Sequence, residues 1–350
     1  MNEQLLSRTD CNAMRGLAII GIFLHNYCHW LSPVVKENEY QYFQQNVDGM
    51  ISSICIPDSL LPMHILSFLG HYGVPVFLFL SAYGLVMKYE KKNDAVVPPT
   101  FSFIKRHYMK LFKMMIIGFV AFTMLDLITP GAHNYKFIDI VAMIGMFNNV
   151  LPKPDDVIWP GPYWFFGLML QLYIVYKLFL CRRNGIFVVL FMAVCLFGQL
   201  FFDAEGEALN RYRYNFMGGM LPFGLGVLYA RYGHKMTMWG YASMFVVSSL
   251  LVCVLSCSFL GWTFVPAFVC TASIGLVKLL NGKGFNSIKS LLVWMGSISA
   301  ALFVCHPITR KIFIPISKNG DYYAGFLLYI ITSICLAWLF NELIKRIPLK

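Results

Sequence analysis

In the first long apolar run of this 350-residue sequence, two ionisable side chains, Arg15 and His25, lie ten residues apart, and a second histidine, His29, follows. In a helix their ten-residue spacing separates them by about 15 Å, half of the apolar thickness of a bilayer. Ionisable groups are costly inside a membrane, so each needs a reason. Arg15 near a helix N-terminus opposes the helix dipole, so helix stability does not explain it. An imidazole in a dry site is suited to accept a proton near neutral pH.

Two other interpretations of this run are open. Arg15 could be a snorkelling cation at the cytoplasmic face, and His25 a hydrogen-bonded buried side chain. His25, Cys28 and His29 also suggest a metal site, because residues four apart share one face of a helix. No Asp or Glu lies in the same apolar stretch to complete such a site, and the HExxH pattern is absent. We therefore predict no metal.

Three later apolar segments each carry small, polar or aromatic residues that could contribute to a site. Each alone is weak evidence, because small residues and proline are common in packed membrane helices. The residues concerned are Ser81 in the second segment, Trp164 and Tyr173 in the fourth, and Gly296 and His306 late in the chain.

The composition identifies the element that must position these residues as a membrane-spanning helix. Hydrophobic residues make up 58% and charged residues 13% of the chain, against roughly 45–50% and 25% in soluble proteins. A helix needs about 20 residues to cross a bilayer, and we count ten runs of suitable length. They are about 14–32, 64–87, 104–128, 162–181, 185–202, 214–231, 237–257, 260–280, 290–314 and 322–343.

The shorter apolar stretch 137–150 is bracketed by polar segments that contain proline. It is too short for a crossing, so we predict a re-entrant or interfacial helix there. With the N-terminus in the cytoplasm, ten crossings place more than twice as many Lys and Arg residues inside as outside. The positive-inside rule therefore predicts that both termini are cytoplasmic. We expect one transmembrane domain over 1–350, with no appended soluble domain.

The net charge of +11 is largely explained by this topology, so we predict membrane lipid and no nucleic acid as a partner. The basic segment 88–113 could anchor the chain on anionic lipid or bind phosphates of a substrate. Ten cysteines show no CxxC pair. Cys28 and Cys55 could pair if both face an oxidising side, and the sequence leaves that open.

Taken together and in this order, the features resemble the multi-pass membrane acyltransferases of the "acyltransferase three" group, which O-acylate cell-envelope carbohydrates. The resemblance extends from about residue 10 to 343, and the Arg15–His25 pair and the late His306 are its most specific elements. It implies an enzyme of the bacterial cytoplasmic membrane that takes an acyl group, by family prevalence acetyl, from a cytoplasmic coenzyme A thioester. The acceptor would be a hydroxyl of a cell-envelope glycan or lipid-linked sugar.

The resemblance also implies roles for individual residues. His25 would be the catalytic base, with a covalent acyl-histidine as the alternative route. The donor-binding residues would be Arg15, Arg106 and Lys110, and the substrate-binding residues Ser81, Trp164, Tyr173 and His306. Five positions depart from the family pattern: Asn12 replaces an Asp, Ala82 a Gly, His107 an Arg, Lys113 a common Pro and Gln171 a frequent Glu. An amide contact must then replace an Asp–Arg pair, and phosphate binding loses a guanidinium fork.

Two other classes of function remain open from the sequence. A secondary transporter would also have buried histidines and helices broken by proline or glycine, but it predicts matching halves that we do not find. A channel or non-catalytic scaffold would leave Arg15 and His25 replaceable without loss of function. Only the enzyme requires binding of coenzyme A.

Overall fold

The computed structural model describes residues 5–91, 96–282 and 284–347, and within these ranges it contains helices and no strand. The α-helices are α1 (Arg8–Cys28), α2 (Gln44–Cys55), α3 (Leu61–Gly70), α4 (Gly73–Tyr89), α5 (Thr100–Ile128), α6 (Phe137–Gly145), α7 (Pro154–Val157), α8 (Trp164–Val175), α9 (Gly185–Phe197), α10 (Glu207–Tyr214), α11 (Phe216–Tyr232), α12 (Met238–Leu255), α13 (Phe259–Leu279), α14 (Asn286–Lys318) and α15 (Tyr322–Arg346). Short 3₁₀ or π turns are η1 (Asn148–Val150), η2 (Gly161–Tyr163), η3 (Tyr176–Leu180) and η4 (Gly198–Phe201). The prediction of an all-α protein is confirmed.

Seven helical segments of the described chain are long and apolar enough to cross a membrane. They are Leu61–Tyr89, Thr100–Ile128, Gly161–Leu180, Met238–Leu255, Phe259–Leu279, Asn286–Lys318 and Tyr322–Arg346. The three other predicted crossings correspond to α1, whose first half is charged, and to α9 and α11, which have 13 and 17 residues. The protein is thus a multi-pass membrane protein, while the count of ten crossings and the cytoplasmic termini stay predictions.

The predicted short helix at 137–150 is present as α6, which has nine residues and is followed by η1. Nine helical residues extend about 14 Å, less than half of a bilayer core. Met146 ends α6 in a left-handed conformation, with φ 57°.

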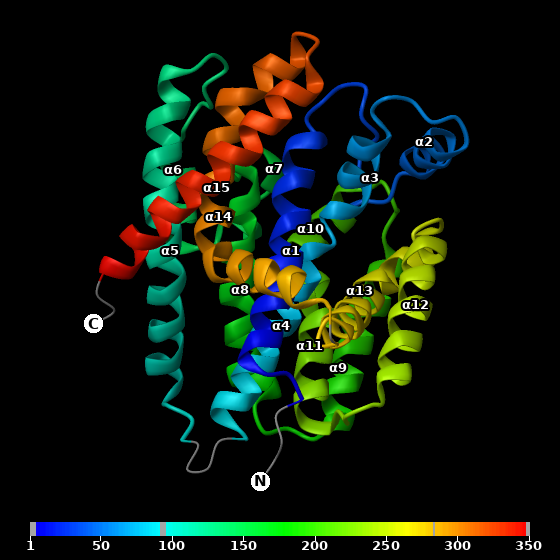
Figure 1. Cartoon of the computed structure of the whole chain (residues 1–350). Helices are drawn as coiled ribbons and strands as arrows, with labels where there is room; N and C mark the ends of the chain where they lie inside the picture. Colours follow the sequence, from blue (N-terminus) through cyan, green and yellow to red (C-terminus); the bar gives the residue numbers. More distant parts are fainter. Residues whose placement is uncertain (1–4, 92–95, 283, 348–350) are drawn as a thin grey trace.

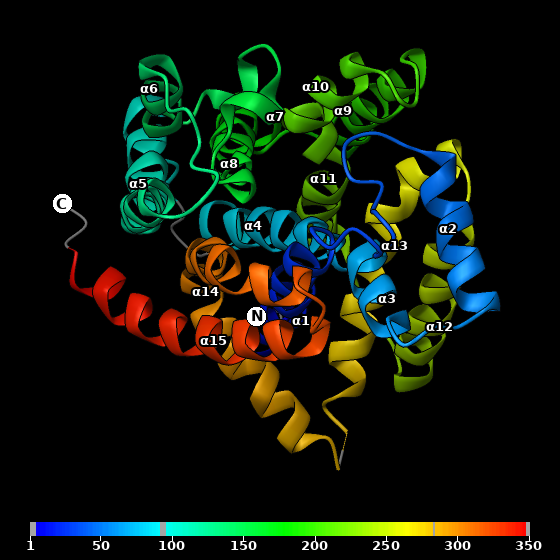
Figure 2. The ribbon, with the colours of Figure 1, turned by 90° about the horizontal axis from the view of Figure 1, so that it is seen from above.

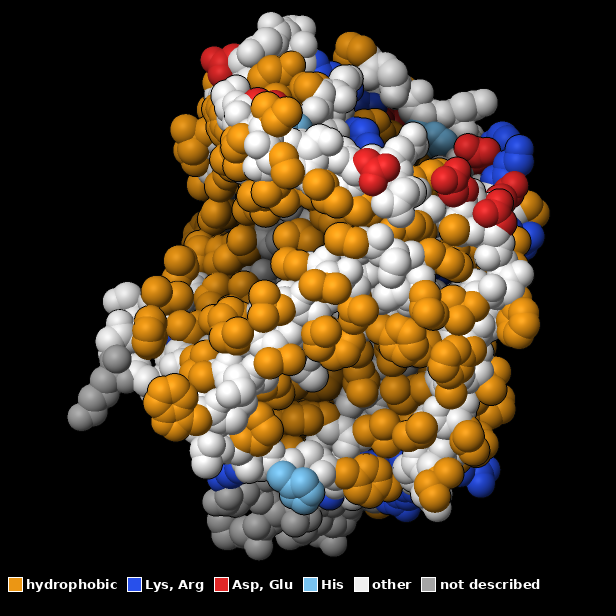
Figure 3. Space-filling view, turned by 90° about the vertical axis from the view of Figure 1, so that its right-hand side faces the viewer, with side chains coloured by type: hydrophobic (Ala, Val, Ile, Leu, Met, Phe, Trp, Pro, Cys, Tyr) orange, Lys and Arg blue, Asp and Glu red, His pale blue; other side chains and the backbone are white. Residues whose placement is uncertain are grey.

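The outer surface matches a bilayer. Hydrophobic side chains dominate the middle of the face shown in Figure 3, and charged side chains gather towards its top and bottom. The start of α1 and the end of α4 lie at the bottom in Figure 1, whereas the connection after α1 and the α14–α15 turn lie at the top. The two thiols that could have paired are free: Cys28 is buried in α1, and Cys55 is exposed at the end of α2.

Helix α1 lies in the middle of the bundle, with α14 and α4 on different sides of it (Figure 2). The α1–α14 crossing brings backbone against backbone at Gly16 and Gly296. A Cβ added at Gly16 would lie 1.9 Å from the Leu292 carbonyl oxygen, and one added at Gly296 would lie 1.9 Å from the Asn12 carbonyl oxygen. Small residues permit this approach in membrane bundles, and here they fix α1 against α14.

The second predicted span is divided into α3 and α4 by a break at His71 and Tyr72. Pro75 lies in the first turn of α4 and has no N–H to donate to the carbonyl four residues earlier, which explains why the helix does not run through. The last four carbonyls of α3 consequently lack helical partners. One of them belongs to Ser67.

The close approach at Gly296 predicts a large effect of a single methyl group. Gly296→Ala forces α14 away from α1, and overpacking of this kind typically costs about 1–3 kcal/mol. Thermal unfolding of purified protein in detergent should therefore show a lower midpoint for Gly296→Ala. Gly84→Ala is the matched control, because a Cβ there meets nothing within 4 Å. Equal midpoints for the two variants would contradict this packing.

Candidate active site

Two cavities flank α1 and α14, and they contain most of the residues that the sequence selected. The first, which we call the arginine cavity, has a volume of about 430 Å³ and is lined by Arg15, Ser81, Lys110 and Tyr173 among others. The second, the histidine cavity, has a volume of about 280 Å³, and its lining includes His25 and Trp164. The structure thus brings together four predicted site residues in one cavity and two in the other.

Arg15 is half-buried at the wall of the arginine cavity. Its Nη1 donates a hydrogen bond of 3.1 Å to Oδ1 of Asn12, which is the amide contact that the sequence required in place of an Asp. Lys110 of α5 lines the same cavity, whereas Arg106, one turn earlier, is exposed and outside the lining. His107 is buried between aromatic rings, with its ring centroid 4.3 Å from that of Tyr173.

His25 is 3% exposed, and its orientation is set by the helix break described above. Its Nδ1 lies 2.7 Å from the Ser67 carbonyl oxygen at the end of α3. A carbonyl can only accept, so Nδ1 carries the proton and Nε2 has a free lone pair. The Nε2 atom faces the histidine cavity and lies 3.7 Å from Oε1 of Glu37.

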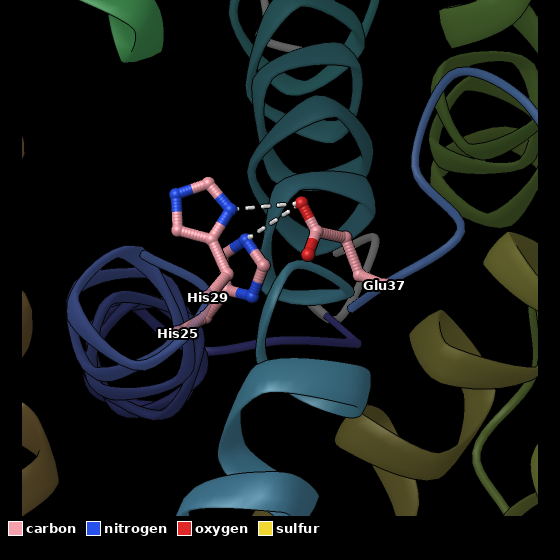
Figure 4. A group of neighbouring side chains, drawn as sticks. All are labelled: His25, His29 and Glu37. Carbon is pink, nitrogen blue, oxygen red and sulfur yellow. Dashed lines mark hydrogen bonds and ion pairs between the residues drawn. The ribbon is translucent and has the colours of Figure 1, made fainter. Parts of the chain in front are cut away.

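Glu37 joins two histidines, as Figure 4 shows. His25 and His29 project from α1, Glu37 comes from the connection that follows it, and both rings converge on one carboxylate oxygen. His29 Nδ1 lies 3.0 Å from Oε1 of Glu37 and donates to it. The His25 ring centroid is also 5.6 Å from that of His71, whose two ring nitrogens are buried without a partner.

Glu37 and Glu39 lie in the same connection, yet their pKa values shift in opposite directions. Burial favours the neutral form of Glu37, but the neighbouring His29 and His25 outweigh it and hold the pKa well below its usual range. Burial, followed by the charge of Glu37, raises the pKa of Glu39 to about 8. At neutral pH the cavity therefore holds a carboxylate beside His25 and a largely protonated Glu39.

Aromatic rings form the rest of the wall. Tyr40 stacks on Tyr214 with 3.9 Å between centroids, and it meets Trp164 edge-on at 5.2 Å. Asp155 accepts from the Tyr214 hydroxyl at 2.5 Å. Arg310 of α14 is 6% exposed, donates to the side chain of Asn26 and lies over the Trp30 ring. Rings beside hydrogen-bonding groups suit a carbohydrate, which has both apolar faces and hydroxyls.

His306 lies outside both cavities, fully buried in α14. Its Nδ1 is 3.0 Å from the Leu302 carbonyl oxygen, so Nδ1 donates and Nε2 is left without a partner. The His306 ring is 5.9 Å from the ring of Phe303, which does line the cavities. His306 therefore does not contact a substrate that is bound in either cavity as the structure stands.

His25, His29 and Glu37 are also the residues that could hold a metal ion, since one ligand atom from each lies within 4.8 Å of the others. With zinc bonds of about 2.0–2.2 Å, tetrahedral ligand atoms lie about 3.3–3.6 Å apart. The group would have to contract around an ion, and His29 Nδ1 would have to lose its proton. Within the group, only His29 Nδ1 and Glu37 Oε1 form a hydrogen bond, and His29 Nε2 and Glu37 Oε2 are buried without a partner. We derive no step through a metal.

Sequence reasoning missed Glu37, Asp155 and Arg310. Glu37 and Asp155 lie in connections with no regular period, so no pattern places them beside His25. Arg310 follows His306 by four residues and therefore shares its face of the helix. That spacing was the one available signal.

The described chain is thus a multi-pass helical membrane protein whose arginine cavity and histidine cavity share one lining residue, Phe303. The sequence profile of the acyltransferase 3 family, described as an acyltransferase domain, matches residues 9–342. The chain belongs to this family and is an acyltransferase. Comparison with curated proteins and with solved structures returned no significant match.

The raised pKa of Glu39 predicts how stability depends on pH. The folded protein keeps this proton up to pH about 8, whereas the unfolded chain releases it near 4.5. Rising pH between these values therefore destabilises the folded state. Glu39→Gln removes this contribution, so its unfolding midpoint should fall less steeply than that of the wild type over this interval.

Thermal unfolding of the purified proteins at pH values across and beyond this interval measures the difference. The exposed Glu205→Gln serves as the control and should follow the wild type. If Glu39→Gln and wild type give parallel curves, the buried proton is not there.

Proposed function

We propose that this protein is an O-acyltransferase that moves an acetyl group from cytoplasmic acetyl-coenzyme A to a hydroxyl of a cell-envelope glycan or lipid-linked sugar. The observation that carries the proposal is the His25 imidazole, with a free Nε2 facing a polar cavity and its proton fixed on Nδ1. Membership of the acyltransferase 3 family supports the reaction class. A transporter is not supported.

The arginine cavity would bind the donor. Coenzyme A has phosphates at one end and a reactive sulfur at the end of a long thin arm. Arg15 and Lys110 can form charge-assisted hydrogen bonds with the phosphates. Arg106 lies on the same face of α5 as Lys110, one turn away and exposed, and would capture the phosphates at the entrance. Ser81 and Tyr173 line the cavity further along and would contact the arm.

The histidine cavity would bind the acceptor, with a sugar ring against Trp164 and hydroxyls on Asp155 and Glu37. Nε2 of His25 takes the proton of the acceptor hydroxyl as its oxygen attacks the thioester carbonyl carbon. The C–S bond then breaks, and His25 returns the proton to the sulfur. Glu37 lies 3.7 Å from Nε2 and stabilises the transient imidazolium by its negative charge, while the Ser67 carbonyl on Nδ1 holds the ring in place.

This arrangement fits the bacterial cytoplasmic membrane, where acetyl-coenzyme A lies on one side and the glycan on the other. The arginine cavity contains the start of α1, which the distribution of basic residues assigns to the cytoplasm. The histidine cavity contains the connection that follows α1 and would face outwards. Direct transfer requires no acyl-histidine, because the Nε2 lone pair suffices as a base.

Replacing His25 tests the proposal. His25→Ala removes the base, and general-base catalysis contributes roughly 10²–10⁴-fold. Acetyl transfer to membrane glycans, measured with radiolabelled acetyl-coenzyme A, should fall by that factor. The exposed His234→Ala should keep wild-type transfer. Wild-type transfer by His25→Ala at equal expression would remove His25 from this role.

A further inference from the structure

One side chain is common to the walls of the two cavities. Among the residues that the structure describes, Phe303 alone lines both the arginine cavity and the histidine cavity. It projects from α14 and is 8% exposed. Its ring packs against Phe165 and Phe166 of α8, with centroid distances of 5.1 and 5.9 Å. Three aromatic rings from two helices thus pack together at the residue that the two cavities share.

The chemistry proposed above requires this passage to open. The thioester arm would come from the arginine cavity, whereas His25 and the acceptor are on the other side of Phe303. The acyl carbon can meet the acceptor oxygen only beside this ring. A polar cavity on each side would also let water through if the ring were absent.

We propose that Phe303 is a movable partition that keeps the thioester away from water in the histidine cavity and limits the donor to short acyl groups. The proposal rests on the proposed function. A short acyl group passes after a small rotation of the ring, whereas a longer one must displace the Phe165–Phe166–Phe303 cluster. His306 is then a positioning residue, since its buried ring packs edge-on against Phe303 at 5.9 Å.

The partition has a chemical consequence that is separate from acyl transfer. Without the ring, water takes the place of the acceptor: its oxygen attacks the thioester carbonyl carbon as His25 takes a proton. The C–S bond breaks, the sulfur receives the proton, and free carboxylic acid and coenzyme A are released. Phe303→Ala should therefore hydrolyse the donor when no acceptor is present.

The first test measures thiol release from acetyl-coenzyme A by the purified full-length protein without acceptor. Phe303→Ala should exceed the wild type by roughly tenfold or more, and Phe303→Leu should lie between them. The relative rate with a butyryl donor should also rise in Phe303→Ala. Phe340→Ala is the matched control and should hydrolyse the donor as the wild type does, because Phe340 is a buried phenylalanine of α15 that lines neither cavity.

The second test needs no catalysis. Ser299 lines the arginine cavity, so a Ser299→Cys thiol should be protected from a small membrane-impermeant methanethiosulfonate added outside sealed, right-side-out vesicles. In a double variant that combines Ser299→Cys with Phe303→Ala, the same thiol should become reactive. Labelling of Phe303→Ala without the added cysteine gives the background. Unchanged labelling in a variant with wild-type thermal stability overturns the partition. Increased labelling without thioester cleavage by any variant supports the partition and refutes the acyltransferase chemistry.

Discussion

The orientation of the proposed catalytic imidazole depends on one hydrogen bond, from Nδ1–H of His25 to the Ser67 carbonyl. A helix end leaves carbonyls without partners, and burying one unpaired is costly. The break between α3 and α4 creates such a carbonyl, and the imidazole satisfies it. Because this bond fixes the proton on Nδ1, the lone pair of Nε2 faces Glu37 and the histidine cavity. The same interaction therefore stabilises the fold and, in the proposed mechanism, leaves Nε2 free to act as the base.

Backbone contacts keep this geometry rigid. Gly16 and Gly296 lock α1 onto α14, and a Cβ at Gly70 would lie 2.5 Å from Cβ of His25, so α3 also touches α1 directly. Arg15 and His25 are consequently held at fixed depths on one helix, against two others. Both cavities are lined by residues of α1 and α14, and in the proposed mechanism each substrate has its own cavity.

Much of the fold could be predicted from the sequence, because apolar length and charge asymmetry are local properties. The all-helical membrane class and the short helix at 137–150 followed from them, and Arg15, Ser81, Lys110 and Tyr173 were selected before their shared cavity was visible. Glu37 and Asp155 could not be found, since they come from connections whose paths are set by tertiary packing. Arg106 was chosen by motif position and lies outside the cavity, because it is exposed one turn nearer the start of α5 than Lys110.

The central claim is that donor binding and proton transfer belong to different side chains in different cavities. Equilibrium binding of acetyl-coenzyme A to purified protein, measured by calorimetry, tests it most directly. We predict that Arg15→Gln weakens binding by about tenfold or more, through loss of charge-assisted hydrogen bonds. His25→Ala should bind the donor as the wild type does. Wild-type affinity in Arg15→Gln, or lost affinity in His25→Ala, would contradict the account.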